Sequence, residues 1–328
     1  MPQIATWCED LVSIKDLGPS GVSAVLDLAA LMKARPEDFR GALAGKQLVL
    51  FFEKPSLRTR LTFEAGIHSL GGSSFFFDQT GSHLGARESL SDVAHNLERW
   101  VDGIILRTFA HSTVTLMAEH ASIPVVNGLS DYEHPCQALA DYLTLQQKFG
   151  DLSKVKLAYV GDGNNVAHSL LLAAACSGGS IAIATPTGYE PNAQVVSLAK
   201  SIATTTGATI MLTNNPQKAV AGADAVYTDV WASMGQEDEA ADRKNIFGAY
   251  QVSDALMAKA APHAIFMHCL PAHRGDEVSA SVIDSSRSVV FDQAENRLHV
   301  QKAILLMLLG GSIHRFSAGF KKPRTTHA

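Results

Sequence analysis

Cations and hydroxyl groups gather directly after an expected strand at residues 48–52. Ser56, Arg58, Thr59 and Arg60 follow it, and Lys54 is adjacent, which puts three cations within seven residues. A helix over 59–70 is expected next, and N–H groups at a helix start, hydroxyls and guanidinium groups suit a phosphate-type dianion. A capped helix start with solvated cations is the alternative. The density of charge favours the anion site.

A second group lies at the start of an expected helix over 135–149. His134, Gln137 and Asp141 follow a strand at 124–126. The positive end of a helix dipole disfavours an imidazolium, so His134 is expected to be neutral and, with Gln137, able to hold a carbonyl group. Taken alone, a helix cap with a buried histidine is the commoner arrangement. Arg107, after a strand at 103–106, is either a third partner or a surface cation.

Residues 161–166 read Gly-Asp-Gly-Asn-Asn-Val, close to a dinucleotide-binding turn. Val166 stands where that motif requires glycine, and the next strand ends in Thr185 without an acidic residue for a ribose. The sequence therefore disfavours a dinucleotide. Asn165 is the better candidate for hydrogen bonding to a small ligand.

Two further strand ends carry reactive side chains. Asp229 follows a strand at 225–228 and precedes a glycine-containing loop, so its carboxylate could bind an amine. Cys269 follows a strand at 264–267. It is either a small buried hydrophobe, which is the commoner fate of a cysteine, or a thiol that faces a ligand.

The elements that must position these residues alternate along the chain. The length of 328 residues is typical of two domains. Short apolar runs buried on both faces indicate parallel strands, and the helix-like stretches between them indicate two doubly wound α/β domains with central parallel sheets, joined by interdomain helices. A turn at 150–153 is the expected boundary, and a last helix is expected over 297–309. The expected strands cover residues 48–52, 74–77, 103–106, 124–126, 156–160, 181–184, 209–212, 225–228, 264–267 and 289–291.

Composition excludes several classes of protein. Hydrophobic residues make up 46% of the chain, which argues against disorder, and the net charge of −5 argues against nucleic-acid binding. The four cysteines form no CxxC pair, which argues against a structural zinc site or a disulfide scaffold. No secretory signal and no run long enough to cross a membrane is visible. The expectation is a cytoplasmic protein that binds neither nucleic acid nor membrane.

Four motifs in this order resemble the ornithine-specific branch of the aspartate/ornithine carbamoyltransferase family. They are SxRTR at 56–60, HPxQxLAD at 134–141, DxxxSMG at 229–235 and HCLP at 268–271. The similarity extends over residues 48–301. Two positions depart from the commoner family pattern, since Leu57 replaces a threonine and His83 stands where many relatives carry glutamine.

The resemblance implies an activity and an assembly. The family transfers the carbamoyl group of carbamoyl phosphate to the side-chain amine of L-ornithine, which gives L-citrulline and phosphate in arginine metabolism. It implies a carbamoyl phosphate domain at 1–150, an ornithine domain at 151–301 and a C-terminal helix, about 302–328, that packs back on the first. It also implies a homotrimer or a multiple of trimers, and neither a metal nor an organic cofactor.

The resemblance also assigns roles to residues. Arg107, His134, Asp229 and Cys269 are implied to be catalytic. Ornithine is implied to contact Asn165, Asp229, Ser233 and Met234. Carbamoyl phosphate is implied to contact Ser56, Leu57, Arg58, Thr59, Arg60, His83, Arg107, His134, Pro135, Cys136, Gln137, Cys269, Leu270 and Arg297.

Two alternatives remain open at this stage. Aspartate-specific relatives are expected to carry a lysine near His83 and an HPGP-like motif at 268–271, and neither is present; relatives that use diamines or acylated ornithine differ around residues 233–235. A non-catalytic anion-binding protein on the same scaffold is the alternative from another class. The intact Arg107, His134, Asp229 and Cys269 argue against it.

Overall fold

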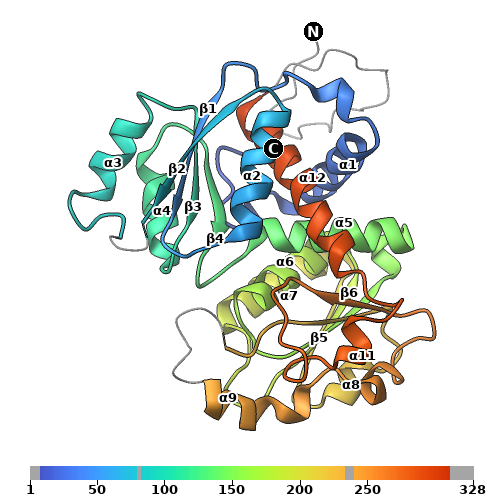
Figure 1. The fold of residues 1–328 in the computed structure, drawn as a ribbon. Helices are drawn as coiled ribbons and strands as arrows, with labels where there is room; N and C mark the ends of the chain where they lie inside the picture. The colour runs from blue at the N-terminus through green and yellow to red at the C-terminus, as the bar shows by residue number, and fades with distance from the viewer. Residues whose placement is uncertain (1–7, 80–82, 233–239, 311–328) are drawn as a thin grey trace.

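Two parallel β-sheets form the framework of the chain (Figure 1). The computed structural model describes residues 8–79, 83–232 and 240–310. The first sheet has the strand order β2-β1-β3-β4 and the second has the order β7-β6-β5-β8-β9. Every pair of neighbouring strands is parallel. The expected fold of two doubly wound α/β units is thereby confirmed.

The strands lie close to where the alternating apolar runs place them. The first sheet is built from β1 (Gln47–Phe52), β2 (Ser73–Asp78), β3 (Gly103–Arg107) and β4 (Val125–Leu129). The second is built from β5 (Lys156–Val160), β6 (Ser180–Ala184), β7 (Thr209–Thr213), β8 (Ala225–Thr228) and β9 (Ile265–His268).

Successive residues of one strand enter different apolar cores. In β5, Leu157 and Tyr159 join the largest core, whereas Ala158 and Val160 join a second core on the opposite face. Side chains alternate between the faces of a sheet, so a strand buried on both faces reads as a continuous apolar run.

Helices connect the strands. In the first half they are α1 (Gly18–Ala34), α2 (Leu57–Ser69), α3 (Leu90–Leu97), α4 (His111–His120) and α5 (Pro135–Phe149). In the second half they are α6 (Asn165–Ser177), α7 (Ala193–Thr206), α8 (Pro216–Val220), α9 (Ala240–Phe247), α10 (Asp254–Met257), α11 (Ala280–Ile283) and α12 (Val290–Leu309). Short 3₁₀ turns lie at Ile14–Asp16, Pro36–Phe39, Leu152–Lys154 and Gly248–Tyr250.

The last helix joins the two halves. α12 follows β9 of the second half, and it packs against α1, α2 and α5 of the first (Figure 1). The largest apolar core includes buried residues of α1, α5, α6 and α12 together with residues from one face of each sheet. The two sheets are therefore held together by a shared layer of helices.

One expected strand is wrong. Residues 289–291, predicted to be a strand, are instead the start of α12, which begins at Val290 rather than near 297. The N–H of Val289 does donate to Phe266 O of β9 (3.0 Å), but the chain then turns into the helix and leaves Phe291 exposed. Among the described helices, none combines the length and the apolar character that crossing a membrane requires.

Candidate active site

Each sheet has one topological switch point, a pair of adjacent strands from which the chain connections run in opposite directions. We call it the reversal point, and the functional side chains lie there. In the first sheet the reversal lies between β1 and β3, and in the second it lies between β5 and β8. Ligands of doubly wound sheets bind at such points, beyond the carboxyl ends of the strands. Thr59 follows β1 and Arg107 ends β3, whereas Asn164 and Asp229 follow β5 and β8.

Two buried guanidinium groups meet one hydroxyl in the first half. Arg297 Nη2 donates to Thr59 Oγ1 (2.8 Å), and Arg107 Nη1 lies 3.4 Å from the same oxygen. Arg107 comes from the end of β3, Thr59 from the first turn of α2 and Arg297 from α12. The Ser56 hydroxyl accepts from the Thr59 N–H and caps α2. The start of this helix is therefore fixed beside two cations.

His134 and Gln137 lie next to this pair at the start of α5. Gln137 Oε1 accepts from Arg297 Nη1 (3.0 Å). The backbone N–H of His134 donates to Ser169 Oγ of α6 (2.9 Å), which anchors the residue to the second half. Burial, followed by the charges of Arg297 and Arg107, holds the pKa of His134 well below its ordinary value. His134 is therefore a neutral imidazole, as the sequence predicts, although burial rather than the helix dipole is the largest cause.

Burial of the Arg107 and Arg297 guanidinium groups disfavours their charged forms. Burial and the charge of Arg297 lower the pKa of Arg107 to about 10. Among the described residues, Arg107 Nε, Arg297 Nε and His134 Nδ1 are buried and have no hydrogen-bond partner. Buried polar atoms are normally satisfied, so a bound anion or carbonyl group is a suitable partner for the guanidinium N–H groups.

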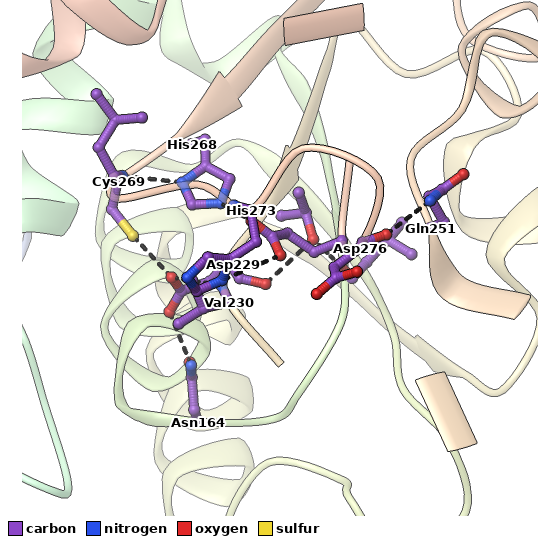
Figure 2. Close-up of polar contacts among 12 residues, drawn as sticks. Asn164, Asp229, Val230, Gln251, His268, Cys269, His273 and Asp276 are labelled. Atoms are coloured by element: carbon purple, nitrogen blue, oxygen red, sulfur yellow. Dashed lines mark hydrogen bonds and ion pairs between the residues drawn. The ribbon is translucent and has the colours of Figure 1, made fainter. Parts of the chain in front are cut away.

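A carboxylate and a thiol face each other in the second half (Figure 2). Cys269 Sγ donates to Asp229 Oδ1 (3.0 Å), and Asn164 Nδ2 donates to Asp229 Oδ2 (2.9 Å). Burial and the charge of Asp229 raise the pKa of the Cys269 thiol well above its ordinary value. The thiol is therefore protonated, and Asp229 is the group that can receive an ammonium or amine.

The loop after β9 has an unusual backbone. Leu270 adopts a left-handed conformation (φ 58°) and precedes a cis bond to Pro271. Its N–H donates to His268 Nδ1 (2.9 Å), and His268 Nε2 lies 3.2 Å from the buried Glu277 Oε1. These contacts place Cys269 and Leu270 at the end of the sheet.

One set of donors could in principle hold a metal ion. Atoms of Asp229, His268 and Cys269 all lie within 4.8 Å of one another. However, the thiol already donates to the carboxylate, and both ring nitrogens of His268 have partners. These internal contacts account for the arrangement without a metal.

Several predicted site residues are engaged elsewhere. Arg60 stacks over the Phe76 ring (3.6 Å) and pairs with Glu64, and the Cys136 thiol is buried against Asn127 O, so neither side chain joins Arg107 and Arg297. Leu57 is 68% exposed. Arg58 is partly exposed and Pro135 is buried in the first turn of its helix.

Four other predicted positions lie near the site, at an exposed edge or outside the described residues. Asn165 Nδ2 donates to Ser130 O (2.6 Å), across the boundary between the two halves. His83 Nδ1 lies 3.5 Å from Glu53 Oε1, at the exposed edge of the first half. Ser233 and Met234 lie outside the described residues.

Sequence reasoning missed two polar residues of the site. Asn164 contacts Asp229, whereas its neighbour Asn165 contacts Ser130 O. The sequence does not distinguish the two asparagines, because their directions depend on the fold of the turn after β5. Glu53 is buried and accepts from the N–H groups of Leu84 and Phe109. A carboxylate directly after an apolar strand was the available signal for Glu53.

Comparison with protein families agrees with this geometry. Residues 9–147 match the carbamoyl-P binding domain of aspartate/ornithine carbamoyltransferase, and residues 153–308 match its Asp/Orn binding domain. Together the two matches cover most of the chain.

Individual relatives extend the similarity over nearly the whole length. The chain is 50% identical over 303 residues to an ornithine carbamoyltransferase of Carboxydothermus hydrogenoformans, covering 92% of this chain and 97% of that protein. It is 52% identical over 297 residues to one of Parafrankia sp., covering 90% and 94%. A solved ornithine carbamoyltransferase from Pyrococcus furiosus superposes with a TM-score of 0.89 at 46% identity, covering 94% of this chain and 99% of that one. With both domain models matched and this identity over nine-tenths of its length, the chain belongs to the aspartate/ornithine carbamoyltransferase family.

Proposed function

We propose that this protein transfers the carbamoyl group of carbamoyl phosphate to the side-chain amine of L-ornithine, giving L-citrulline and phosphate. One observation carries the proposal. Two buried guanidinium groups and a neutral histidine lie at the reversal point of one sheet, and a buried carboxylate lies at that of the other. The first set suits an anion with a carbonyl group, and the second suits an amine.

The first half would bind carbamoyl phosphate. Ser56, Arg58 and Thr59 supply hydroxyl, guanidinium and N–H groups at the start of α2 for the phosphate. Arg107, His134 and Gln137 lie beside them and would hold the carbamoyl group. The domain of residues 1–150, completed by the C-terminal helix, is proposed to carry this substrate. The helix begins at Val290, earlier than the sequence indicated.

The second half, residues 151–301, would bind ornithine. Asp229 accepts from Asn164 and Cys269, and its carboxylate would also accept from an ammonium or amine. Asn165, Ser233 and Met234 complete the proposed site, as the family resemblance implies.

The chemistry follows from these placements. The unprotonated amine of ornithine attacks the carbamoyl carbon, an N–C bond forms, and the C–O bond to phosphate then breaks. The proton that the attacking nitrogen loses ends on the departing phosphate. Negative charge develops on the carbonyl oxygen and on the departing phosphate. Arg107, Thr59 and neutral His134 can donate to these oxygens, and preorganised donors in a buried site are an effective source of catalysis. No step requires a metal or an organic cofactor.

The proposal includes a homotrimer, or a multiple of trimers, working in the cytoplasm. Support for the assembly comes from β2, which is the outer strand of its sheet. Phe75, Phe77 and Trp100 are 48%, 49% and 66% exposed around a groove of about 660 Å³ that His83 also lines. Large exposed apolar surface of this kind is typical of an interface. A neighbour seated there would lie beside His83.

A citrulline assay tests the proposed function. Purified protein is given carbamoyl phosphate with ornithine, putrescine, aspartate or acetylornithine in turn. Ornithine should be carbamoylated with the highest kcat/KM. A preference for any other acceptor, or no product with all four, would contradict the proposal.

A further inference from the structure

A buried carboxylate behind the site contacts no residue that the proposed chemistry assigns to ornithine. Asp141 on α5 is 0% exposed. Its Oδ1 accepts from Gln137 Nε2 (2.8 Å) and from Gln293 Nε2 of α12 (2.9 Å). One oxygen atom therefore holds two glutamine side chains that come from different helices.

The carboxylate fixes which way each amide points. A glutamine that donates its NH₂ to Asp141 must present its carbonyl oxygen at the other end. Gln137 Oε1 accepts from Arg297 Nη1 (3.0 Å), and Gln293 Oε1 accepts from the backbone N–H of His268 (3.0 Å). Both of these outer partners are donors only, so a flipped amide would place donor against donor at both ends.

The two glutamines connect Asp141 to opposite halves of the site, and each chain of contacts from Asp141 through one glutamine is called a branch here. Through Gln137 the first reaches Arg297, which donates to Thr59 Oγ1 (2.8 Å) on the side proposed for carbamoyl phosphate. Through Gln293 the second reaches His268, whose neighbour Cys269 donates to Asp229 on the side proposed for ornithine. Asp141 is the point at which the two branches meet.

We propose that Asp141 is a positioning residue that sets Arg297 and the 268–270 loop in the mutual geometry required for carbamoyl transfer. This inference rests on the proposed function. Burial raises the pKa of Asp141 to about 6, so the group is an anion at neutral pH despite its surroundings. An apolar residue of similar size would avoid that desolvation but could orient neither glutamine.

Four variants separate positioning from simple packing. Asp141→Asn keeps an oxygen that can accept from both amides, whereas Asp141→Leu keeps the volume and removes the acceptor. Gln293→Leu cuts only the branch to His268. Gln301→Leu is the matched control, because Gln301 is a buried glutamine on the same helix whose amide atoms have no partner among the described residues.

Citrulline kinetics and calorimetry with carbamoyl phosphate give the expected pattern. Loss of a buried hydrogen-bond acceptor should lower kcat/KM for ornithine in Asp141→Leu by about 10²-fold and weaken carbamoyl phosphate binding by about 10-fold. Gln293→Leu should lower kcat/KM for ornithine by about 10-fold and leave carbamoyl phosphate binding within about 2-fold. Asp141→Asn should recover most of the loss, and Gln301→Leu should match wild type.

The outcomes that overturn the proposal are distinct from failure of the proposed function. The wild-type chain is assayed first; if it forms no citrulline, the proposed function fails and the positioning role fails with it. If wild type is active, a folded Asp141→Leu with wild-type kinetics overturns the positioning role alone. If Asp141→Leu does not fold, the result for Gln293→Leu decides. The positioning role is overturned if Gln293→Leu has wild-type kinetics, or if its loss in kcat/KM is no larger than that of Gln301→Leu.

Discussion

At the scale of single residues, the charge state of His134 decides what it can do. Burial and two neighbouring guanidinium groups hold its pKa well below the ordinary value, so it carries no charge at neutral pH. A neutral imidazole can donate one N–H to a carbonyl oxygen without adding a third positive charge to the site. In the proposed reaction, stabilisation of the developing oxyanion would then depend on the fixed positions of Arg107 and Thr59.

Asp229 provides a test of the ornithine side. Asp229→Asn keeps the shape of the side chain but removes the charge that would attract an ammonium or amine. The loss in kcat/KM for ornithine should be on the order of 10²-fold, about 2.7 kcal/mol, as measured by steady-state citrulline formation. Carbamoyl phosphate carries no ammonium, so its binding to the free enzyme should barely change.

Asp224 is the matched control for that experiment. Its carboxylate accepts from Lys156 N (2.8 Å) at the opposite end of β8 from Asp229. Asp224→Asn should therefore leave ornithine kinetics unchanged. Equal loss of both ligands in Asp229→Asn, or unfolding of that variant alone, would make Asp229 a structural strand-end carboxylate.

Glu133 predicts a dependence of stability on pH. Its buried carboxylate accepts from Ser13 Oγ (2.5 Å), Ile14 N (3.2 Å) and Ser169 Oγ (3.1 Å), yet burial outweighs these bonds and raises its pKa from 4.5 to about 7. The folded state therefore binds the proton more tightly than the unfolded state. The resulting contribution to stability is complete below pH 4.5 and is lost as pH rises through 7.

Glu133→Gln removes this titration. Relative to the variant, wild type should lose on the order of 3 kcal/mol in the free energy of unfolding between pH 4 and pH 8. Urea unfolding of both proteins at several pH values measures the difference. A difference that stays constant with pH would show that Glu133 has an ordinary pKa.

The residues that sequence could identify share one property. Arg107 ends a strand, and His134, Asp229 and Cys269 come after strands, so an apolar run with a polar side chain at its end marked them as candidates. The family resemblance then assigned their roles. Asp141, which the sequence places beside His134 and Gln137, also bonds to Gln293 of a distant helix, and Glu133 lies between elements and bonds to Ser13. The partners Gln293 and Ser13 are 152 and 120 residues away, and no local pattern specifies such distant pairs.

At the scale of elements, the start of α12 shows why a local pattern can mislead. Val289 and Val290 are buried and β-branched, which is typical of a strand, and Val289 does bond to β9. Beyond them, Val290, Gln293, Arg297 and Val300 are buried at helical spacing. Two of these four residues are polar, because this face of the helix lies against the site as well as against the apolar core. The apolar residues alone therefore do not repeat at helical spacing here.

Gly163, in the turn between β5 and α6, has no room for a side chain. A Cβ on this residue would lie 2.3 Å from Pro191 N and 2.5 Å from Tyr189 O, and both are backbone atoms that cannot rotate away. Gly163→Ala should therefore displace the turn that carries Asn164. The thermal midpoint should fall, and KM for ornithine should rise by about 10-fold or more, because an Asn164 contact is lost.

Gly188 is a suitable control for Gly163. It has open space around it, although its φ of +88° makes alanine somewhat strained. Gly188→Ala should cost some stability but leave KM for ornithine unchanged. If Gly163→Ala also leaves KM unchanged, the turn is not what places Asn164.

At the scale of the whole molecule, the helices shared by the sheets bring the two reversal points together. Asn165 of α6 donates to Ser130 O beyond β4, and His134 N donates to Ser169 Oγ. The alternation of strands and helices predicts two such sheets. It does not predict their mutual orientation, which depends on how α5, α6 and α12 pack.

Assembly gives the final prediction. The outer strand β2 leaves Phe75 and Phe77 exposed, and Trp100 lies on the same groove. Sedimentation at assay concentration should give a multiple of three chains.

Trp100→Glu places a charge in the proposed contact and should shift the protein toward single chains. Citrulline formation should fall in parallel if a neighbour completes the site near His83. Phe291→Glu is the control, because Phe291 is 77% exposed on α12 and does not line the groove, so its assembly should be unchanged. A fully active single chain would refute the shared site and leave His83 an ordinary surface residue.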